Sequence, residues 1–248
     1  MSAVLLFQTS SADPIPMDEE PRIETADAGP SSPSSASASA SASASASAST
    51  SASTSALPPD PVLYRILVAQ DTSPSPYPRA LSELLSGRKS SHWVWFVWPT
   101  LLSVRRTSRP DLELPSFASA CSYLLHPILL SRLIEATSAA TKHLQAGVKA
   151  EVLFGAQWRY DKPKFHEACT LFLLAARANR AAEEEEEEEG EKEEGGGTMG
   201  EEERVFEEGL DAIAGGTMNE AVLTVLENEG VDVNALLMLR CGPSSSSS

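Results

Sequence analysis

The stretch that decides the fold class is residues 116–147, SFASACSYLLHPILLSRLIEATSAATKHLQAG. Apolar residues recur at helical spacing on both sides of His126-Pro127, and Leu129 and Leu133 begin an apolar face in the second half. Because proline is tolerated in the first turn of a helix, the His-Pro pair predicts a break between two helices. No alternation typical of a strand persists beyond a few residues. We therefore predict an all-α fold, a single compact multi-helix domain.

Further helical segments flank this stretch on both sides. Residues 77–85 have leucines at helical spacing, and Gly87 is placed to cap that helix at its C-terminal end. We expect a polar loop over AQWRYDKPKF, residues 156–165. Three later segments also read as helices: ACTLFLLAARANR (168–180), RVFEEGLDAIAGG (204–216) and NEAVLTVLENEG (219–230).

Two low-complexity segments set the domain boundaries. Residues 31–56 contain almost only Ser and Ala and offer nothing large to bury, so we expect residues 1–60 to be a disordered arm. The run EEEEEEEGEKEEGGGTMGEEE, residues 183–203, is expected to be an acidic disordered insertion. The predicted domain is then residues 61–230, followed by a C-terminal tail, 231–248.

Charge is distributed unevenly along the chain. The net charge is -16, yet residues 61–180 contain fifteen Lys and Arg against eight Asp and Glu, a net charge of +7. The predicted domain is therefore basic and its appendages are acidic. This distribution of charge bears on which partners the protein binds and does not bear on its fold.

The sequence also bears on the compartment. The start, MSAVLLFQTS, has no basic residue and is soon followed by acidic ones, unlike a secretory signal or transit peptide. No apolar run approaches 18 residues, so we expect no membrane span. Cys121, Cys169 and Cys241 are widely separated and read as free thiols. We expect an intracellular protein in the cytoplasm, with a nuclear location left open.

Residues 86–99, SGRKSSHWVWFVWP, contain the strongest candidate site. The candidate residues are Arg88, Lys89 and His92 together with Trp93 and Trp95. Arg88 and Lys89 could hold a phosphate or carboxylate, and the tryptophan rings could stack a base or a cation. The alternative is that the tryptophans belong to the core and the cations cap the preceding helix. A strand fits the residue types after His92, whereas a short helix capped by Ser90 or Ser91 and stopped by Pro99 fits the flanking residues.

Three more residues are weaker candidates for a ligand site. His126 could point into a cleft or only satisfy a backbone group at a helix start. Asp161 and Lys164 could act on a ligand or form a simple ion pair with each other. The four histidines are scattered and the chain has no CxxC or HxxxH motif, so we predict no metal site. The chain also has no Walker loop, GxGxxG or GxSxG motif, so the sequence predicts no cofactor and no catalytic class.

The residues leave three classes of function open. The first is a domain that binds a small anionic or nucleotide-like ligand at the basic and aromatic edge. The second is a nucleic-acid-binding module on a basic face formed by Arg105, Arg106 and Arg109 together with Arg88, Lys89 and the lysines of 162–164. The third is a protein-interaction scaffold without a small-molecule site, whose partners the sequence does not identify.

Several motifs together resemble the family known as domain of unknown function 1810, whose members are sometimes labelled calpastatin-like. The resemblance spans about residues 64–227 and implies a compact, mostly helical domain with no established reaction. Nothing in the chain looks like a protease-inhibitor repeat. The motifs are Gln70, Tyr77 with its Leu-rich helix, Gly87-Arg88-Lys89, His92-Trp93-Val94-Trp95-Phe96, Pro99, Ala120 to Leu129 with His126-Pro127, Phe154-Gly155, Asp161 with Lys164, and Thr170-Leu171-Phe172.

The chain departs from the family pattern at several places, which include a longer loop, AQWRY (156–160), after Gly155. Thr100 stands where the family has a glutamine, and Glu167-Ala168 stand where it has a pair of serines. The residues SVRRTS, 103–108, replace a Gly-Leu-Gly-x-Ser loop. A site that needs the family residues at these places would be altered in this chain.

Overall fold

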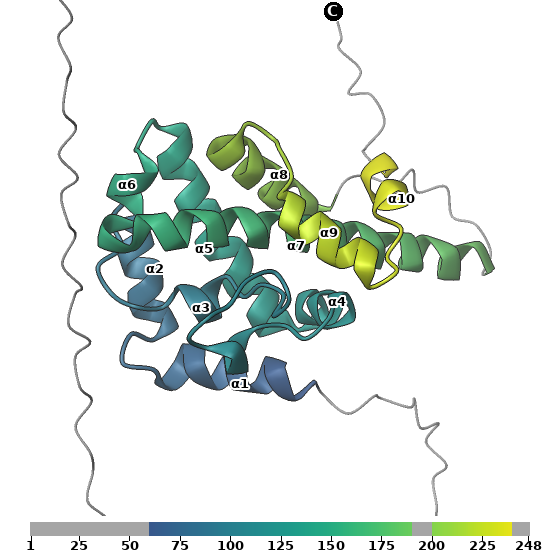
Figure 1. The fold of residues 1–248 in the computed structure, drawn as a ribbon, viewed down its shortest axis with the longest axis horizontal. Helices are drawn as coiled ribbons and strands as arrows, with labels where there is room; N and C mark the ends of the chain where they lie inside the picture. The colour runs from purple at the N-terminus through teal and green to yellow at the C-terminus, as the bar shows by residue number, and fades with distance from the viewer. Residues whose placement is uncertain (1–59, 190–199, 240–248) are drawn as a thin grey trace, which may run out of the picture. The chain divides into compact units, whose positions relative to one another are not determined.

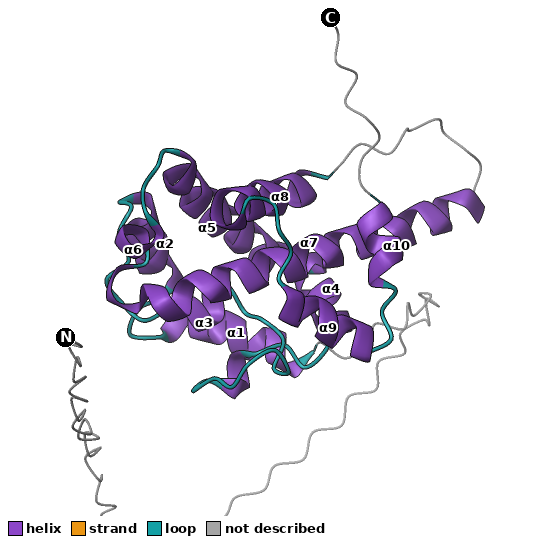
Figure 2. Cartoon of the chain, turned by 45° about the horizontal axis from the view of Figure 1, so that its top comes forward, coloured by secondary structure: helices purple, strands orange, loops and turns teal. Residues whose placement is uncertain are grey.

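The computed structural model describes residues 60–189 and 200–239, which form one compact unit of helices joined by short loops (Figures 1 and 2). Within these ranges there is no strand, only an isolated bridge between Leu101 and Leu114. The prediction of an all-α fold is confirmed. The helices are α1 Pro61–Thr72, α2 Tyr77–Leu85, α3 Val94–Val97, η1 Pro110–Leu112, α4 Phe117–Leu125, α5 Pro127–Gln145, α6 Ala150–Leu153, η2 Gly155–Gln157, α7 Trp158–Glu189, α8 Glu201–Ala214, α9 Glu220–Asn228 and α10 Val233–Met238.

The break between α4 and α5 lies where the sequence predicts it. His126 ends α4 and also precedes α5, where its Nδ1 accepts a hydrogen bond from the backbone N–H of Leu129 at 3.4 Å. Pro127 occupies the first position of α5, where a missing N–H costs no hydrogen bond. Leu129 and Leu133 are buried, so the predicted apolar face of α5 turns into the core.

The C-terminal end of α2 is also set by the sequence. Gly87 adopts a positive φ of 73°, and its N–H bonds to the carbonyl of Leu84 at 2.9 Å. The N–H of Arg88 reaches the carbonyl of Glu83 at 3.1 Å, which completes a Schellman motif. The helix therefore stops just before the segment that carries Lys89 and His92.

Helix α7 is the central element of the domain. It crosses the view in Figure 1 with α8 and α10 above it and α1, α3 and α4 below it. Phe165, Cys169 and Phe172 on this helix are buried. Helices α4, α6, α8, α9 and α10 all contact α7, so α7 fixes the positions of these helices relative to one another.

The expected polar loop over residues 156–165 is wrong. Helix α7 begins at Trp158 and includes Pro163 in its second turn. Proline there forfeits one intrahelical hydrogen bond, and burial of Phe165 and Ala168 just after it keeps the chain helical. Asp161 and Lys164 consequently lie on a helix that faces the core and not on a surface loop.

Two expected boundaries also differ from the structure. Helix α7 continues to Glu189 and α8 begins at Glu201, so the acidic segment 183–203 is helical at both of its ends. Glutamate is a good helix former, and it extends a helix that already exists at little cost. The expected tail 231–248 contains α10, whose Leu236 is buried. Residues 1–59, 190–199 and 240–248 lie outside the described residues, and with them most of the predicted arm.

Across the described ranges, no single helix is long and apolar enough to cross a membrane. Helices α4 and α5 together reach the required length and composition, but they are bent by 95° at the break between them.

Candidate ligand-binding cavity

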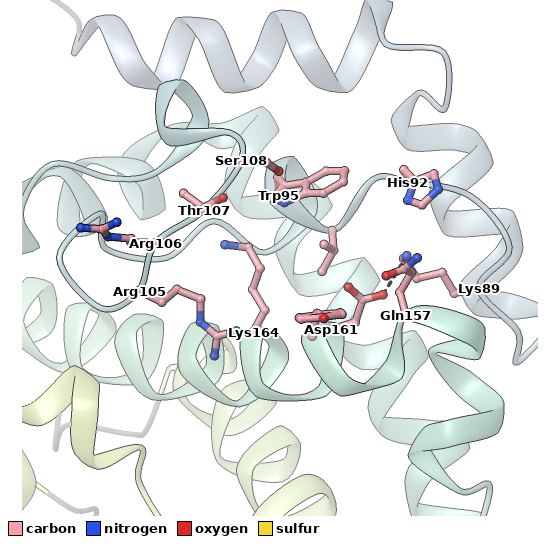
Figure 3. Close-up of a pocket in the computed structure, with 12 residues that line it drawn as sticks. Lys89, His92, Trp95, Arg105, Arg106, Thr107, Ser108, Gln157, Asp161 and Lys164 are labelled. Carbon is pink, nitrogen blue, oxygen red and sulfur yellow. Dashed lines mark ion pairs between the residues drawn. The ribbon is translucent and has the colours of Figure 1, made fainter. Parts of the chain in front are cut away.

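A cavity of about 230 Å³ lies between the loop after α2, helix α3, the loop 105–108 and the first two turns of α7 (Figure 3). Five of the eight candidate site residues line it: Lys89, His92, Trp95, Asp161 and Lys164. They come from two segments more than 60 residues apart in the sequence, so the fold brings them together. The other lining residues are Val94, Arg105, Arg106, Thr107, Ser108, Gln157 and Tyr160.

The remaining three candidates do not line the cavity. Arg88 is exposed and does not line the cavity, unlike its neighbour Lys89. His126 caps α5, in line with the alternative that it only satisfies a backbone group at a helix start. Trp93 is fully buried and packs edge-on against Trp98, with ring centroids 5.5 Å apart. Trp93 is therefore a core residue.

Trp95 is the tryptophan of α3 that reaches the cavity. It is half-buried, whereas Trp93 and Trp98 are both completely buried. The ring of His92 lies nearly parallel to that of Trp95, with an interplanar angle of 24° and centroids 6.2 Å apart. The cavity therefore has an aromatic wall beside its charged groups.

Glu83 on α2 holds the loop that carries Lys89 and His92. Its carboxylate accepts hydrogen bonds from the N–H of Ser90 at 2.8 Å, the N–H of Ser91 at 3.0 Å and the Ser91 hydroxyl at 2.7 Å. It also accepts one from Nε1 of Trp93 at 2.9 Å. Ser90 and Ser91 therefore do not cap the short helix, which begins only at Val94.

The hydrogen bonds also determine the acidity of Glu83. Burial alone would raise the pKa of this carboxyl, but the donors from Ser90, Ser91 and Trp93 hold the pKa well below its usual range. Sequence reasoning missed Glu83. Its position between Ala80 and Leu84, on the buried face of α2, was the one available signal.

Lys89 and Asp161 form a buried ion pair on the cavity wall. Nζ of Lys89 lies 2.8 Å from Oδ2 of Asp161, and both side chains are 3% exposed. Burial raises the pKa of Asp161, and the Lys89 ammonium offsets part of that increase. Asp161 and Lys164 were expected to pair with each other if they formed a simple ion pair, but each has another partner.

Lys164 pairs with Glu113, a residue that sequence reasoning did not select. Nζ of Lys164 lies 2.6 Å from Oε1 of Glu113 and 3.1 Å from the hydroxyl of Thr100. The other carboxylate oxygen of Glu113 accepts from the N–H and the hydroxyl of Thr100, at 3.0 and 2.9 Å. All three residues are buried, so this network forms the floor beneath the ammonium group.

Two arginines of the loop 103–108 complete the charged lining. Arg105 pairs with Glu167 of α7. Burial raises the pKa of Glu167, and the guanidinium of Arg105 lowers it in part. Arg106 is exposed and makes no ion pair or side-chain hydrogen bond with any described residue. In Figure 3 it lies at one end of the cavity and His92 at the other.

Gly155 permits the close approach that positions Lys89. It has a φ of +61°, and a Cβ built on it would lie 2.6 Å from the backbone oxygen of Lys89. The N–H of Lys89 in turn bonds to the carbonyl of Leu153 at 2.7 Å. A side chain at position 155 would therefore push the Lys89 backbone away from the cavity wall.

Replacing Gly155 with alanine should destabilise the domain and displace Lys89. The left-handed backbone alone costs about 1–2 kcal/mol for a residue with a Cβ, and the clash adds to it. Gly215→Ala is the matched control, because Gly215 has a φ of +60° with nothing within 4 Å. Urea unfolding of both variants should show a larger loss for Gly155→Ala. Equal losses would contradict a role for the close contact.

The described residues contain no group of three or more His, Cys, Asp or Glu side chains that could hold a metal ion. The two cysteines in this part of the chain, Cys121 and Cys169, are free, and burial raises the pKa of Cys121 to about 11. Neither cysteine lines the cavity, which offers cations, a carboxylate, an aromatic wall, hydroxyl groups and an amide.

Fold and cavity define an all-α domain with a small polar cavity at the start of its longest helix. The chain belongs to a family described as proteins of unknown function (DUF1810), whose model matches residues 61–189. It is also similar to the conserved hypothetical protein Rv1873 from Mycobacterium tuberculosis, known from a crystal structure. Identity is 27% and the TM-score is 0.51, over 68% of this chain and 99% of the other. No curated protein gives a significant match.

Thr100, Glu167 and the segment 103–108, which the resemblance singled out as departures, lie around the cavity. Thr100 bonds to Lys164, and Glu167 pairs with Arg105. The segment 103–108 supplies Arg105 and Arg106.

Proposed function

We propose that the cavity binds a small anionic ligand, of the nucleotide-like kind that also presents a flat ring. The observation that carries the proposal is that Arg106, which has no carboxylate partner among the described residues, lines one cavity with three further cations and Trp95. Lysine and arginine side chains are the usual protein groups that bind phosphate and carboxylate.

The charge balance at the cavity supports an anion. Three of the four cations have a carboxylate partner within the domain, namely Asp161, Glu113 or Glu167. Arg106 is the fourth and has no such partner among the described residues. One exposed guanidinium without a partner among the described residues therefore lines a partly enclosed space, where an anion would be less hydrated and held more strongly than in open water.

A small ligand is preferred to nucleic acid for a related reason. Binding of a phosphate backbone needs many free cations on an accessible face. Of the cations that the sequence assigned to such a face, Lys89, Lys164 and Arg105 are paired internally, and Arg109 pairs with Asp111 at 2.9 Å. Few of them remain to contact a backbone of phosphates.

The proposal is tested by replacing Arg106 with glutamine. Thermal unfolding of the full chain would be followed with inorganic phosphate, sugar phosphates, nucleotides and small carboxylates, and at least one should give a saturable rise in the midpoint. The rise should fall by more than half in Arg106→Gln. Arg88→Gln is the matched control, because Arg88 is an exposed cation of the same domain that does not line the cavity. Absence of any rise, or equal loss in both variants, would overturn the proposal.

A further inference from the structure

The cavity contains a carboxylate that a plain anion would not need. Asp161 lines it together with four cations, and its side chain is 3% exposed and paired with Lys89. A carboxylate repels phosphate, so a site for inorganic phosphate alone would be stronger without it. Carboxylates in nucleotide sites instead accept hydrogen bonds from ribose hydroxyls.

Arg106 and Asp161, which is paired with Lys89, lie at different ends of the cavity (Figure 3). Figure 3 shows Arg106 at one end and Asp161 with Gln157 toward the other, while Trp95 lies above the space between them. A ligand that spans the cavity would thus meet a guanidinium first, then an indole, then an acceptor beside an amide. The cavity therefore suits a ligand that has an anionic group at one end and a group that donates hydrogen bonds at the other.

The size of the cavity limits what can fill it. Its volume, about 230 Å³, lies just below the range of roughly 300–1,000 Å³ usual for pockets that hold drug-sized molecules. That space suits one sugar and one ring, with part of the molecule left at the open edge near Tyr160, which is 71% exposed. A dinucleotide or an oligonucleotide would exceed it.

We propose that the ligand is a ribonucleoside monophosphate, with its phosphate on Arg106, its base against Trp95 and its ribose hydroxyls on Asp161. This inference rests on the proposed function, since it specifies the ligand class of the same cavity. The hydroxyls of Thr107 and Ser108, which also line the cavity, would add donors to the phosphate.

The test is calorimetric titration of the full chain with a graded set of probes. These are inorganic phosphate, ribose 5-phosphate, the four ribonucleoside monophosphates and their 2′,3′-dideoxy forms. One ribonucleotide should bind about tenfold more tightly than ribose 5-phosphate, because a stacked base contributes an effect of this order. The same ribonucleotide should bind about tenfold more tightly than its dideoxy form, which lacks the hydroxyls.

Two variants assign these differences to residues. Trp95→Ala should remove the preference for the nucleotide over ribose 5-phosphate, and Asp161→Asn should remove the preference for ribose over dideoxyribose. If a variant does not fold, the two affinity ratios measured on the natural chain still test the proposed ligand class. Equal binding of phosphate, ribose 5-phosphate and nucleotide would overturn this inference and leave the anion site standing. No binding of any probe would overturn both proposals.

Discussion

Replacing Glu83 with alanine is expected to lower the free energy of unfolding by about 3–5 kcal/mol, as removal of one partner of a buried charged network does. The carboxylate is the shared acceptor for the N–H groups of Ser90 and Ser91, the Ser91 hydroxyl and the Trp93 indole. Without it, four donors lose their acceptor at the edge of the core. Lys89 and His92 lie on the same loop, so ligand binding should be lost as well.

Urea unfolding at pH 7 measures the loss, with Arg79→Ala as the control. Arg79 also contacts Glu83, but its side chain is 56% exposed, and such a pair contributes about 0–1 kcal/mol. The control should therefore be nearly neutral. A loss below about 1 kcal/mol in Glu83→Ala itself would show that the loop does not depend on this carboxylate.

The pKa of Glu83 makes its contribution depend on pH. Because the folded-state pKa is depressed, the stabilisation is fully present above the unfolded-state pKa, about 4.3, and is lost as the pH falls toward the folded-state value. The difference in stability between the natural chain and Glu83→Gln should be constant above about pH 5 and should shrink below about pH 4. A constant difference down to pH 3 would contradict the depressed pKa.

Most of the fold was predictable because its signals are local. The spacing of Leu129 and Leu133, Pro127 at a helix start and Gly87 just past a helix end each act within a few residues. The errors arose where a local signal was ambiguous. Pro163 and its polar neighbours are typical of a loop, but burial of Phe165 just after the proline stabilises a helix there.

The candidate site was predictable in part for the same reason. Lys89, His92 and Trp95 lie within seven residues and reach one cavity, and Asp161 with Lys164 are one helical turn apart. The charged partners could not be found this way. Glu113 lies 51 residues from Lys164, and Glu167 lies 62 residues from Arg105. A single acidic residue in a loop or helix has no pattern that reveals a partner at such a distance.

The pairing of Lys164 with Glu113 leads to the second large effect. Replacing Lys164 with methionine should lower the free energy of unfolding by about 3–5 kcal/mol, because the Glu113 charge would remain buried without a cation. The Glu113 side chain is only 1% exposed, so water cannot replace the ammonium without opening the floor of the cavity. Chemical denaturation of the single variant at neutral pH gives this value.

The double variant Lys164→Met with Glu113→Gln separates the cause from simple loss of packing. The amide oxygen of the glutamine can still accept from Thr100, whose N–H lies 3.0 Å from the carboxylate, and no buried charge remains. The double variant should thus be more stable than Lys164→Met alone, with a coupling energy of about 1–3 kcal/mol between the two sites. If the two losses simply add, the buried charge is not what makes Lys164 necessary, and its role would be to fill space beside Thr100. A positive coupling would show that the floor of the cavity is held by charge compensation, so that any anion bound above it meets an ammonium fixed from below.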